Sequence, residues 1–255
     1  MKELIEKLGR EPGSHKGENG KVLVIGGSEK YTGAPALSAE AALRAGADLV
    51  KILTSEESKP VVQSFSENLI AESYGNKFDE ESLEKAQELE EWADVTVVGP
   101  GILSFEHSAL QEFAKGARKL IVDAEAIEHL IDTENNIFTP HSGEAEIMAE
   151  KSSSIKMYSF ETGNTVLMKG EKDRIFHGKQ IEENETGCAG MTVGGTGDVL
   201  TGVLGALKAQ GLSDRDAAVL AAHVNGEAGE KAFEKFGNGL LATDIVEMIP
   251  KVLIE

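Results

Sequence analysis

The chain has a single cysteine, few aromatic residues and fewer basic than acidic residues. Cys188 is alone among 255 residues, which excludes an internal disulfide framework and indicates a reducing compartment. Lys and Arg total 25 against 44 Asp and Glu, which gives a formal net charge of −19. So acidic a chain lacks the basic field that nucleic-acid phosphates require. We therefore expect no nucleic-acid partner.

Long hydrophobic runs are also missing from the sequence. The first ten residues, MKELIEKLGR, contain no apolar signal core, and no run approaches the roughly 20 residues that span a bilayer. We therefore expect a cytoplasmic protein without membrane contact. Apolar residues still make up 40% of the chain, enough for a globular core, and no low-complexity linker or repeat divides it. The sequence predicts a single domain over residues 1–255.

Short runs rich in β-branched residues alternate with segments of helical spacing. The runs predict buried parallel strands because their apolar residues are nearly continuous, and they cover residues 22–27, 49–54, 94–100, 119–123 and 164–170. The segments 34–47, 80–92 and 106–115 carry apolar residues on one helical face. This alternation predicts an α/β fold with a mainly parallel sheet.

The pattern changes in the last third of the chain. Residues 173–182 predict a small hairpin around His177-Gly178. Residues 196–210, 214–236 and 241–249 predict three helices with no strand after them, and we expect these helices to cover the same sheet. The Ser-rich stretch 151–160 is the best candidate for a mobile loop.

A glycine-rich segment, residues 187–200, precedes the first of these helices. It contains Gly194-Gly195-Thr196-Gly197-Asp198. Three glycines in four positions let backbone N–H groups turn inward, and the start of the helix adds its positive dipole end. The segment therefore predicts an anion-binding turn, although it matches neither the P-loop nor the GxGxxG pattern.

Asp198 directly follows this turn, and two interpretations are open. A carboxylate beside bound phosphate is repelled unless it has a task, and a general base would accept the proton of a hydroxyl that attacks phosphorus. The alternative is a helix N-cap, for which Asp is common. We favour the base, because capping does not require the preceding glycines.

Two further stretches lie at expected strand ends. Residues 139–144, TPHSGE, follow a short strand and open a helix at 145–150, which places His141 and Glu144 where ligands bind in open sheets. The alternative is that these residues only form a turn and start the helix. Lys169 ends the strand at 165–168, so its ammonium could reach a phosphate or could simply be exposed.

These motifs together resemble the ADP-dependent NAD(P)H-hydrate dehydratases, the carbohydrate-kinase-like half of the YjeF proteins in the ribokinase-like superfamily. The resemblance covers nearly the whole chain. Its most specific part is His15-Lys16-Gly17 with Gly20, followed by residues 22–28, 31–35 and 41–50. The later parts, in the family's order, are residues 99–101, 123–124, 139–144, 169–170 and 190–200.

The resemblance implies a three-layer αβα sandwich and a hydro-lyase of metabolite repair. Such enzymes dehydrate the S epimer of NADHX and NADPHX, the hydrates of NADH and NADPH, and use ADP, or ATP in eukaryotic members, with release of AMP and phosphate. Family members usually self-associate, so a homodimer or homotetramer is expected. The epimerase half of fused members is absent from this sequence, so a separate epimerase would have to assist with the other epimer.

The resemblance also implies site residues. Ala34, Gly101, His141 and Asp198 match positions that contact the hydrate. The positions that match nucleotide-binding residues are Lys169, Gly170, Glu171, Lys172, Asp173 and Gly197. The family often has a small hydroxylated residue shortly after the Lys-Gly pair, where this chain has Glu171 to Arg174, so the nucleotide contacts there are less securely transferred.

Combining these inferences, we predict that Asp198 deprotonates the hydrate hydroxyl for attack on ADP. Backbone amides of Gly195, Thr196 and Gly197 would hold the developing charge. A Mg²⁺ ion is expected to neutralise nucleotide phosphate charge, with Glu144 as the carboxylate that orients it.

Two other functions use the same turn. A vitamin-precursor kinase of the hydroxyethylthiazole kinase type would share the glycines and the aspartate, but the early HisLysGly and TyrThrGlyAla stretches favour the dehydratase. A non-catalytic nucleotide sensor would keep anion binding without needing Asp198 or His141.

Overall fold

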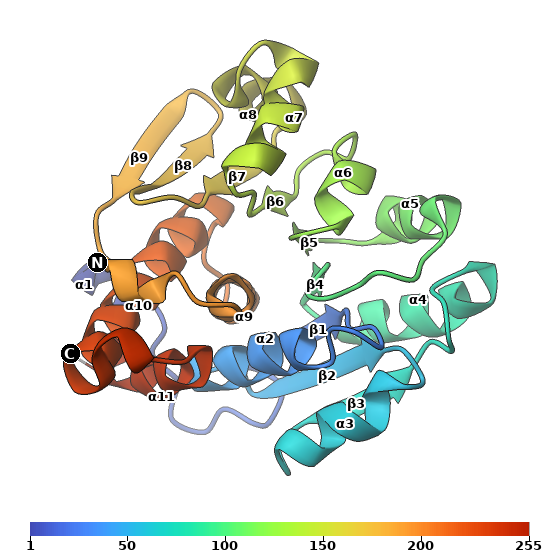
Figure 1. The fold of residues 1–255 in the computed structure, drawn as a ribbon, viewed down its shortest axis with the longest axis horizontal. Coiled ribbons are helices and arrows are strands. Elements are labelled where there is room, and N and C mark those ends of the chain that lie inside the picture. The colour runs from blue at the N-terminus through green and yellow to red at the C-terminus, as the bar shows by residue number, and fades with distance from the viewer. Residues whose placement is uncertain (255) are drawn as a thin grey trace.

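The computed structural model describes residues 1–254 and joins their strands into one nine-stranded sheet (Figure 1). The strand order is β3-β2-β1-β4-β5-β6-β7-β8-β9. The strands are β1 (Lys21–Ile25), β2 (Leu49–Thr54), β3 (Ile70–Ser73), β4 (Val95–Val98), β5 (Leu120–Val122), β6 (Ile137–Phe138), β7 (Thr165–Met168), β8 (Asp173–His177) and β9 (Gln180–Asn184). The first seven pair in parallel, and β8 and β9 form the antiparallel hairpin that the sequence predicts.

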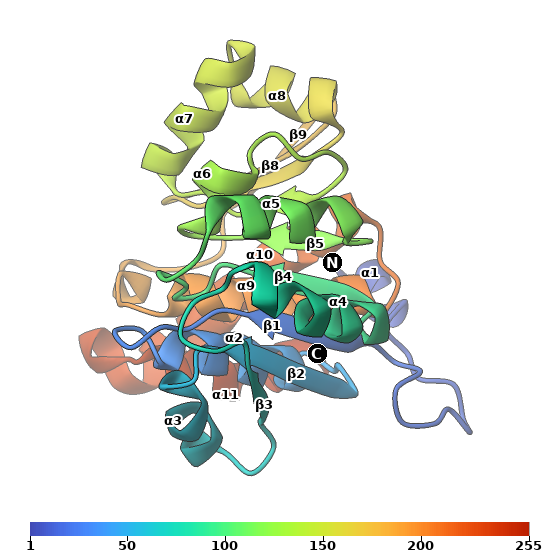
Figure 2. The same cartoon turned by 90° about the vertical axis from the view of Figure 1, so that its right-hand side faces the viewer.

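Helices cover both faces of this sheet. One face carries α2 (Gly33–Arg44), α9 (Thr196–Ala209), α10 (Asp214–Phe236) and α11 (Ala242–Leu253). The other carries α4 (Leu83–Trp92), α5 (His107–Gly116), α6 (Ala126–Leu130), α7 (Ser142–Ser152) and α8 (Ile155–Thr162). Figure 2 shows α4 and α5 in front of the sheet and α10 and α11 behind it. The predicted three-layer αβα arrangement with a mainly parallel sheet is confirmed.

Most strands contribute to two separate hydrophobic cores, because successive side chains point to opposite faces. In β1, Val22 and Val24 belong to the core under α2 and α9, whereas Leu23 and Ile25 belong to the core under α4 and α5. All four side chains are fully buried. Burial on both faces explains why the strands appear in the sequence as continuous apolar runs.

Close packing of α2 against α9 fixes the position of the amino-terminal end of α9 in the fold. A Cβ at Gly202 would lie 2.0 Å from the carbonyl oxygen of Ser38, so only glycine fits this crossing. The Ser38 and Thr201 hydroxyls lie 3.4 Å apart beside it. The first turn of α9, which carries Asp198, is therefore held against the sheet by helix packing.

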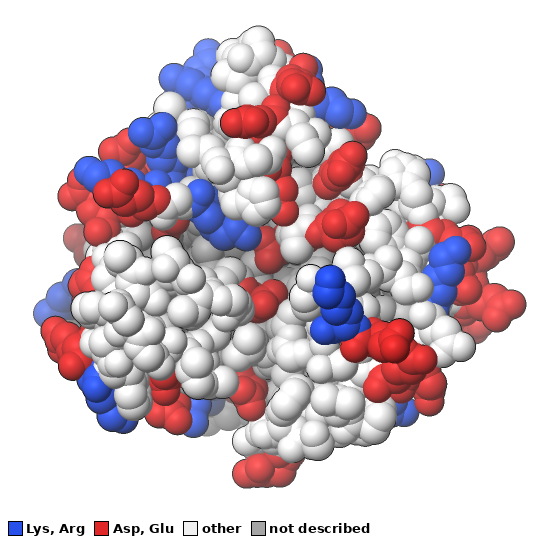
Figure 3. All heavy atoms as spheres, in the orientation of Figure 1, with Lys and Arg blue, Asp and Glu red and all other residues white. Residues whose placement is uncertain are grey.

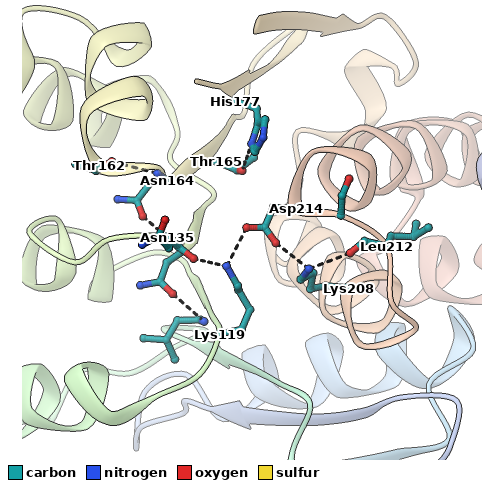
Figure 4. A network of polar contacts seen from close by, with 12 residues as sticks. Lys119, Asn135, Thr162, Asn164, Thr165, His177, Lys208, Leu212 and Asp214 are labelled. Carbon is teal, nitrogen blue, oxygen red and sulfur yellow. Dashed lines mark hydrogen bonds and ion pairs between the residues drawn. The ribbon is translucent and has the colours of Figure 1, made fainter. Parts of the chain in front are cut away.

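A polar network joins the start of α10 to the edge of the sheet where the parallel strands begin (Figure 4). The Asp214 carboxylate lies 2.9 Å from the ammonium of Lys119 and 2.9 Å from that of Lys208. Lys119 also donates to the Asn135 carbonyl, and Lys208 to the Leu212 carbonyl. The network connects β5 with the loop between α9 and α10.

Several sequence expectations need correction. The stretch 151–160, expected to be a mobile loop, is largely helical, since α7 runs to Ser152 and α8 begins at Ile155. Ser152 and Ser153 end α7, and Ser154 caps α8 by accepting the Met157 N–H. The helix expected at 145–150 begins at Ser142, and α3 (Ser58–Phe65) and β3 were not predicted. No helix within residues 1–254 is long and apolar enough to cross a membrane.

Candidate active site

The carboxyl ends of β1, β4, β5, β6 and β7 meet at one edge of the sheet, because these strands are parallel. The loops there touch each other through glycine. A Cβ at Gly26 would lie 2.2 Å from the Pro100 oxygen, and a Cβ at Gly99 would lie 1.9 Å from the Asp123 oxygen. Glycine at these positions lets the loops after β1, β4 and β5 pack into one surface.

The glycine-rich turn reaches this edge at the start of α9. Gly195 is the N-cap and has φ +97°, a left-handed conformation that favours glycine. No side chain caps the helix, and its first backbone bond runs from Val199 N to Gly195 O. The amides of Thr196, Gly197 and Asp198 therefore have no intrahelical acceptor, which is the arrangement that binds anions.

Asp198 lies in the first turn of α9 and does not cap it. The helix begins at Gly195, and no group among residues 1–254 donates a hydrogen bond to the Asp198 carboxylate. Burial, and then the nearby charge of Asp123, raise the pKa of Asp198 to about 7, although Lys169 opposes the shift. A carboxylate with a pKa near neutrality is suited to accept and release a proton.

Lys169 extends from the end of β7 toward the same turn. Its ammonium lies 2.7 Å from Asp123 Oδ1, and a Cβ at Gly197 would lie 3.5 Å from it. Asp123 is buried and also accepts the Thr139 hydroxyl at 2.8 Å. Burial acts to lower the pKa of Lys169, but Asp123, with Glu144 and Asp198, raises it overall. Lys169 is therefore a fixed cation beside the turn and not an exposed strand-end lysine.

His141 and Glu144 form the start of α7. His141 Nδ1 accepts the N–H groups of Gly143 at 3.0 Å and Glu144 at 3.3 Å, while Glu144 Oε2 accepts the His141 N–H at 2.8 Å. This is a capping box, so the helix-start interpretation describes their present contacts. His141 Nε2 lies 3.5 Å from Glu144 Oε1, and Glu144 is close enough to Lys169 to act on it electrostatically.

A cavity of about 640 Å³ lies between the β7–β8 turn, the glycine-rich turn and α10. Its wall contains all six residues predicted to bind nucleotide: Lys169, Gly170, Glu171, Lys172, Asp173 and Gly197. Asp173 shapes this wall by accepting the Gly170 N–H at 3.1 Å and the Asn184 amide at 3.3 Å. Burial raises the pKa of Asp173.

The predicted hydrate-contacting residues fall into separate groups. Ala34, at the start of α2, touches Gly101 after β4, where an added Cβ would lie 3.0 Å from the Ala34 Cβ. Leu37, which lies on α2 with Ala34, packs against Gly195, where an added Cβ would lie 2.7 Å from the Leu37 side chain. This contact places α2 beside the turn that carries Asp198. His141 follows β6 at the same edge of the sheet and belongs to the start of α7. No hydrogen bond or ion pair within residues 1–254 joins His141 directly to Asp198.

Comparison with known proteins identifies the family. The sequence profile of the NAD(P)H-hydrate dehydratases matches residues 22–251. The chain belongs to this family. Its predicted membership and its predicted class of enzyme are thus confirmed.

Relatives of this dehydratase-family chain occur in two lengths. It is 35% identical to the ADP-dependent (S)-NAD(P)H-hydrate dehydratase of Haloterrigena turkmenica, covering 92% of this chain and 93% of the relative. It is 41% identical to the bifunctional NAD(P)H-hydrate repair enzyme Nnr of Methanothermobacter thermautotrophicus, covering 98% of this chain but 53% of that protein. The chain therefore spans about half of the bifunctional relatives and nearly all of the shorter ones.

Solved structures agree with the fold of this family. The ADP/ATP-dependent NAD(P)H-hydrate dehydratase of Bacillus subtilis, co-crystallised with ATP and Mg²⁺, is 26% identical, has a TM-score of 0.82 and is covered to 95%. A hydroxyethylthiazole kinase from Pyrococcus horikoshii has a TM-score of 0.68 at 16% identity, over 98% of this chain and 94% of the kinase, a likeness of fold alone.

The side chains at this site can be compared with the ligands that Mg²⁺ requires. No cluster of three or more His, Cys, Asp and Glu side chains able to hold a metal occurs within residues 1–254. Mg²⁺ at phosphoryl-transfer sites is typically held by one or two carboxylates, substrate phosphates and water, so a dedicated cage is not required. The single carboxylate of Glu144 near Lys169 fits such an ion carried by the nucleotide.

Sequence reasoning missed several residues of the site. Asp123 was assigned no role, although its position at the end of a buried strand is a signal for the sheet's functional edge. Asn225 and Gly226 on α10 also line the nucleotide cavity. They come from the middle of a long helix, and nothing in the local sequence pattern indicates that this stretch faces a cavity.

Proposed function

We propose that this chain dehydrates the S epimer of NADHX and NADPHX to NADH and NADPH, using ADP and releasing AMP and phosphate. The observation that carries the proposal is the position of Asp198. Its carboxylate is half-buried, unbonded and poised with a pKa of about 7 at the uncapped start of α9, next to the nucleotide cavity. That combination brings a general base and an anion site together.

The proposed reaction converts a poor leaving group into a good one. Asp198 takes the proton of the ring hydroxyl, whose oxygen attacks the terminal phosphorus of ADP, and the bond from phosphorus to AMP breaks. The new ester then loses phosphate with its C–O electron pair, assisted by the lone pair of the ring nitrogen. Loss of a proton from the neighbouring ring carbon restores the double bond. The net change is removal of water from the hydrate and hydrolysis of ADP.

The chain's cationic and dipolar groups support the phosphoryl transfer. The amides at Thr196 and Gly197 and the Lys169 ammonium surround the position where negative charge develops, so they would stabilise it more in the transition state than before. Mg²⁺ would supply further charge neutralisation on the nucleotide phosphates, with Glu144 holding it directly or through water.

A direct assay tests this function. Purified protein is mixed with separated S and R epimers of NADHX and NADPHX, with ADP or ATP and with or without Mg²⁺, and recovery of NADH absorbance is followed together with AMP and phosphate. We expect recovery with the S epimers and ADP. A stable phosphorylated product from a small alcohol, with no NADH from any hydrate, would instead support the hydroxyethylthiazole kinase type. Tight nucleotide binding without any turnover would support a sensor.

We also infer a cytoplasmic homo-oligomer that cooperates functionally with an NAD(P)HX epimerase, which supplies the S epimers from the R hydrates. The isolated thiol of Cys188 is consistent with a reducing compartment. Exposed Phe236 and Leu241, near the junction of α10 and α11, supply apolar surface for self-association. Figure 3 shows a broad uncharged area where Figure 1 places this part of the fold. Light scattering of the purified chain separates a dimer from a tetramer.

A further inference from the structure

A buried amide in the wall of the nucleotide cavity has no hydrogen-bond partner. Asn225 of α10 lines this cavity and is only 7% exposed. Its Oδ1 is buried and unpaired, and no protein group among residues 1–254 bonds either end of the amide. Buried polar atoms in folded proteins are nearly always satisfied. An unpaired amide at a cavity wall therefore points to a ligand that supplies the missing partners.

Other polar groups on this part of α10 are satisfied by the protein itself. The His223 carbonyl accepts the Thr186 hydroxyl at 3.2 Å, and Glu230 Oε1 accepts the Gly187 N–H at 2.7 Å. These bonds hold the loop before η2 (Ala189–Met191) against α10. Asn225 lies between these two contacts in the sequence and takes part in neither. Its side chain therefore stays unpaired although the groups on both sides of it are bonded.

The cavity has two chemically different ends. At one end, Lys169 and Gly197 lie together at the anion-binding turn. At the other, the loop packs on α10 so tightly that a Cβ at Gly226 would lie 2.2 Å from the Thr186 hydroxyl oxygen. Asn225 directly precedes Gly226 and belongs to this second end, where the Met191 side chain packs beside Gly187 and Gly229 and supplies apolar surface. With phosphates at the turn, the base of a nucleotide falls beside Asn225.

The amide matches one nucleobase edge in particular. Adenine presents its N6 amine donor and its N7 acceptor side by side, and an Asn amide pairs with that edge through two hydrogen bonds. Phosphate oxygens only accept hydrogen bonds and would leave Oδ1 unpaired. The terminal torsion of Asn is broad, so a turn of the amide brings either end to the cavity.

We propose that Asn225 binds the adenine base of the nucleotide through this two-bond pairing and thereby selects adenine nucleotides. The inference rests on the proposed use of ADP in this cavity. It assigns base recognition to α10, separate from the residues that hold the phosphates.

Calorimetric titration with ADP and inosine diphosphate tests the proposal without requiring turnover. Inosine carries a carbonyl where adenine carries the amine, so its edge beside N7 presents two acceptors. The Asn225 amide has only one donor end and therefore loses one of the two bonds in either orientation. We expect the wild-type protein to bind ADP about tenfold or more tighter than inosine diphosphate. In Asn225→Leu, which has similar size and no hydrogen-bonding group, ADP affinity should fall to the level of inosine diphosphate, whose own affinity should change little.

Two controls separate base recognition from damage to the cavity. Thr192→Ala alters another lining residue, whose hydroxyl bonds only to the Ala189 carbonyl, and should keep the wild-type ratio of the two affinities. Thermal melting of the unliganded proteins should show Asn225→Leu at least as stable as wild type, because an unpaired polar group is removed. Asn225→Ala is measured in parallel, so the comparison does not depend on one variant folding well.

The outcomes distinguish this inference from the proposed function. Equal weakening of both nucleotides in the Asn225 variants, or a retained preference for ADP, overturns base recognition by Asn225. Loss of the preference in a protein that turns over no hydrate supports the inference and rejects the dehydratase function. Hydrate turnover by a wild-type protein that binds the two nucleotides equally supports the dehydratase function and rejects base recognition by Asn225. Failure of wild type to bind either nucleotide rejects both.

Discussion

The ammonium of Lys169 lies 2.7 Å from Asp123 Oδ1, although 46 positions separate the two residues in sequence. Asp123 ends β5 and Lys169 ends β7, with β6 between the two strands. The Thr139 hydroxyl, which follows β6, bonds the same Asp123 oxygen at 2.8 Å. Three strand ends are thus joined through one buried carboxylate. This carboxylate holds the cation that faces the glycine-rich turn.

We expect Asp123→Asn to change both the size and the pH dependence of activity. The substitution releases Lys169 and removes a negative charge that helps raise the pKa of Asp198. The value of kcat/KM should fall, and the acidic limb of its pH profile should move to lower pH. Thr139→Val, which removes a neutral partner of Asp123, is the control and should leave the limb in place. An unshifted limb in Asp123→Asn would refute the electrostatic link.

The wild-type enzyme should lose activity below neutral pH. The pKa of Asp198 is raised to about 7, so its basic form is present above that pH and is protonated below it. The value of kcat/KM should therefore fall about tenfold per pH unit well below 7, as for a single essential base. The profile is measured with NADHX over a pH range in which the hydrate is stable. A flat profile between about pH 5 and 8 would show that Asp198 is not the base.

Asp198→Asn should abolish most turnover while sparing nucleotide binding. Asn keeps the size of the side chain but cannot accept the proton, so kcat should fall by about 10²–10⁴-fold. ADP affinity by calorimetry should be kept or increased, because a negative charge beside the phosphates is lost. Near-wild-type kcat would show that another group is the base.

Asp198→Asn should also change how the stability of the protein depends on pH. The folded pKa of Asp198 lies above the ordinary value of 3.8, so ionisation costs stability above pH 7 and the cost disappears as pH falls toward 4. Asp198→Asn should therefore raise Tm at about pH 8 and lose this advantage as the pH falls to about 4. An advantage that is constant with pH would mean that it does not arise from the charge.

Asp214→Asn should destabilise the fold without altering the site. It leaves the half-buried ammonium groups of Lys119 and Lys208 without their carboxylate (Figure 4). We expect a loss of about 2–4 kcal/mol in the free energy of unfolding, since one partner of a largely buried ion pair is removed. Denaturant unfolding measures this, with Glu112→Gln at the exposed Lys115 pair as a control that should have almost no effect. Unchanged stability of Asp214→Asn would count against the network.

The position of Asp214 also predicts acid sensitivity. Burial acts to raise the pKa of Asp214, but hydrogen bonds from Lys119 and Lys208 lower it overall. A lowered folded pKa stabilises the protein above the unfolded value and loses that contribution as pH falls through the folded one. The stability difference between wild type and Asp214→Asn should therefore shrink in strong acid, which unfolding at several pH values can follow.

Gly202→Ala tests how helix packing positions the site. Its added Cβ would lie 2.0 Å from the Ser38 carbonyl oxygen, so α2 and α9 must separate. We expect a loss of about 1–3 kcal/mol in stability. We also expect reduced kcat, because Asp198 lies one turn earlier on α9. Gly33→Ala is a matched control, since its Cβ meets nothing within 4 Å. Equal behaviour of the two variants would contradict the packing account.

Much of the fold could be predicted from local sequence because the central strands are buried on both faces. The runs around Val22–Ile25 and Val95–Val98 are nearly all apolar for this reason. β3 could not be found in this way, since Ile70 is exposed and Glu72 and Ser73 are polar. The serines of 151–160 were misinterpreted because Ser at a helix start and Ser in a loop look alike in sequence.

The site was only partly predictable, because its decisive contacts join distant segments. The glycine-rich turn and Asp198 form a local motif that the sequence itself displays. The contact of Lys169 with Asp123 depends on the strand order β5-β6-β7, which local spacing does not determine. Asn225 lies within a regular helix, and only the packing of the loop around Thr186 shows that it faces a cavity.

Transfer of an oxygen isotope shows whether the hydrate oxygen itself attacks phosphorus. NADHX is prepared by hydration in water enriched in ¹⁸O, transferred to ordinary water, and dehydrated by the enzyme with ADP. The account predicts that the released phosphate carries the labelled oxygen, one atom per NADH formed. Unlabelled phosphate, with the isotope recovered in water, would show that ADP is hydrolysed separately and would contradict the mechanism.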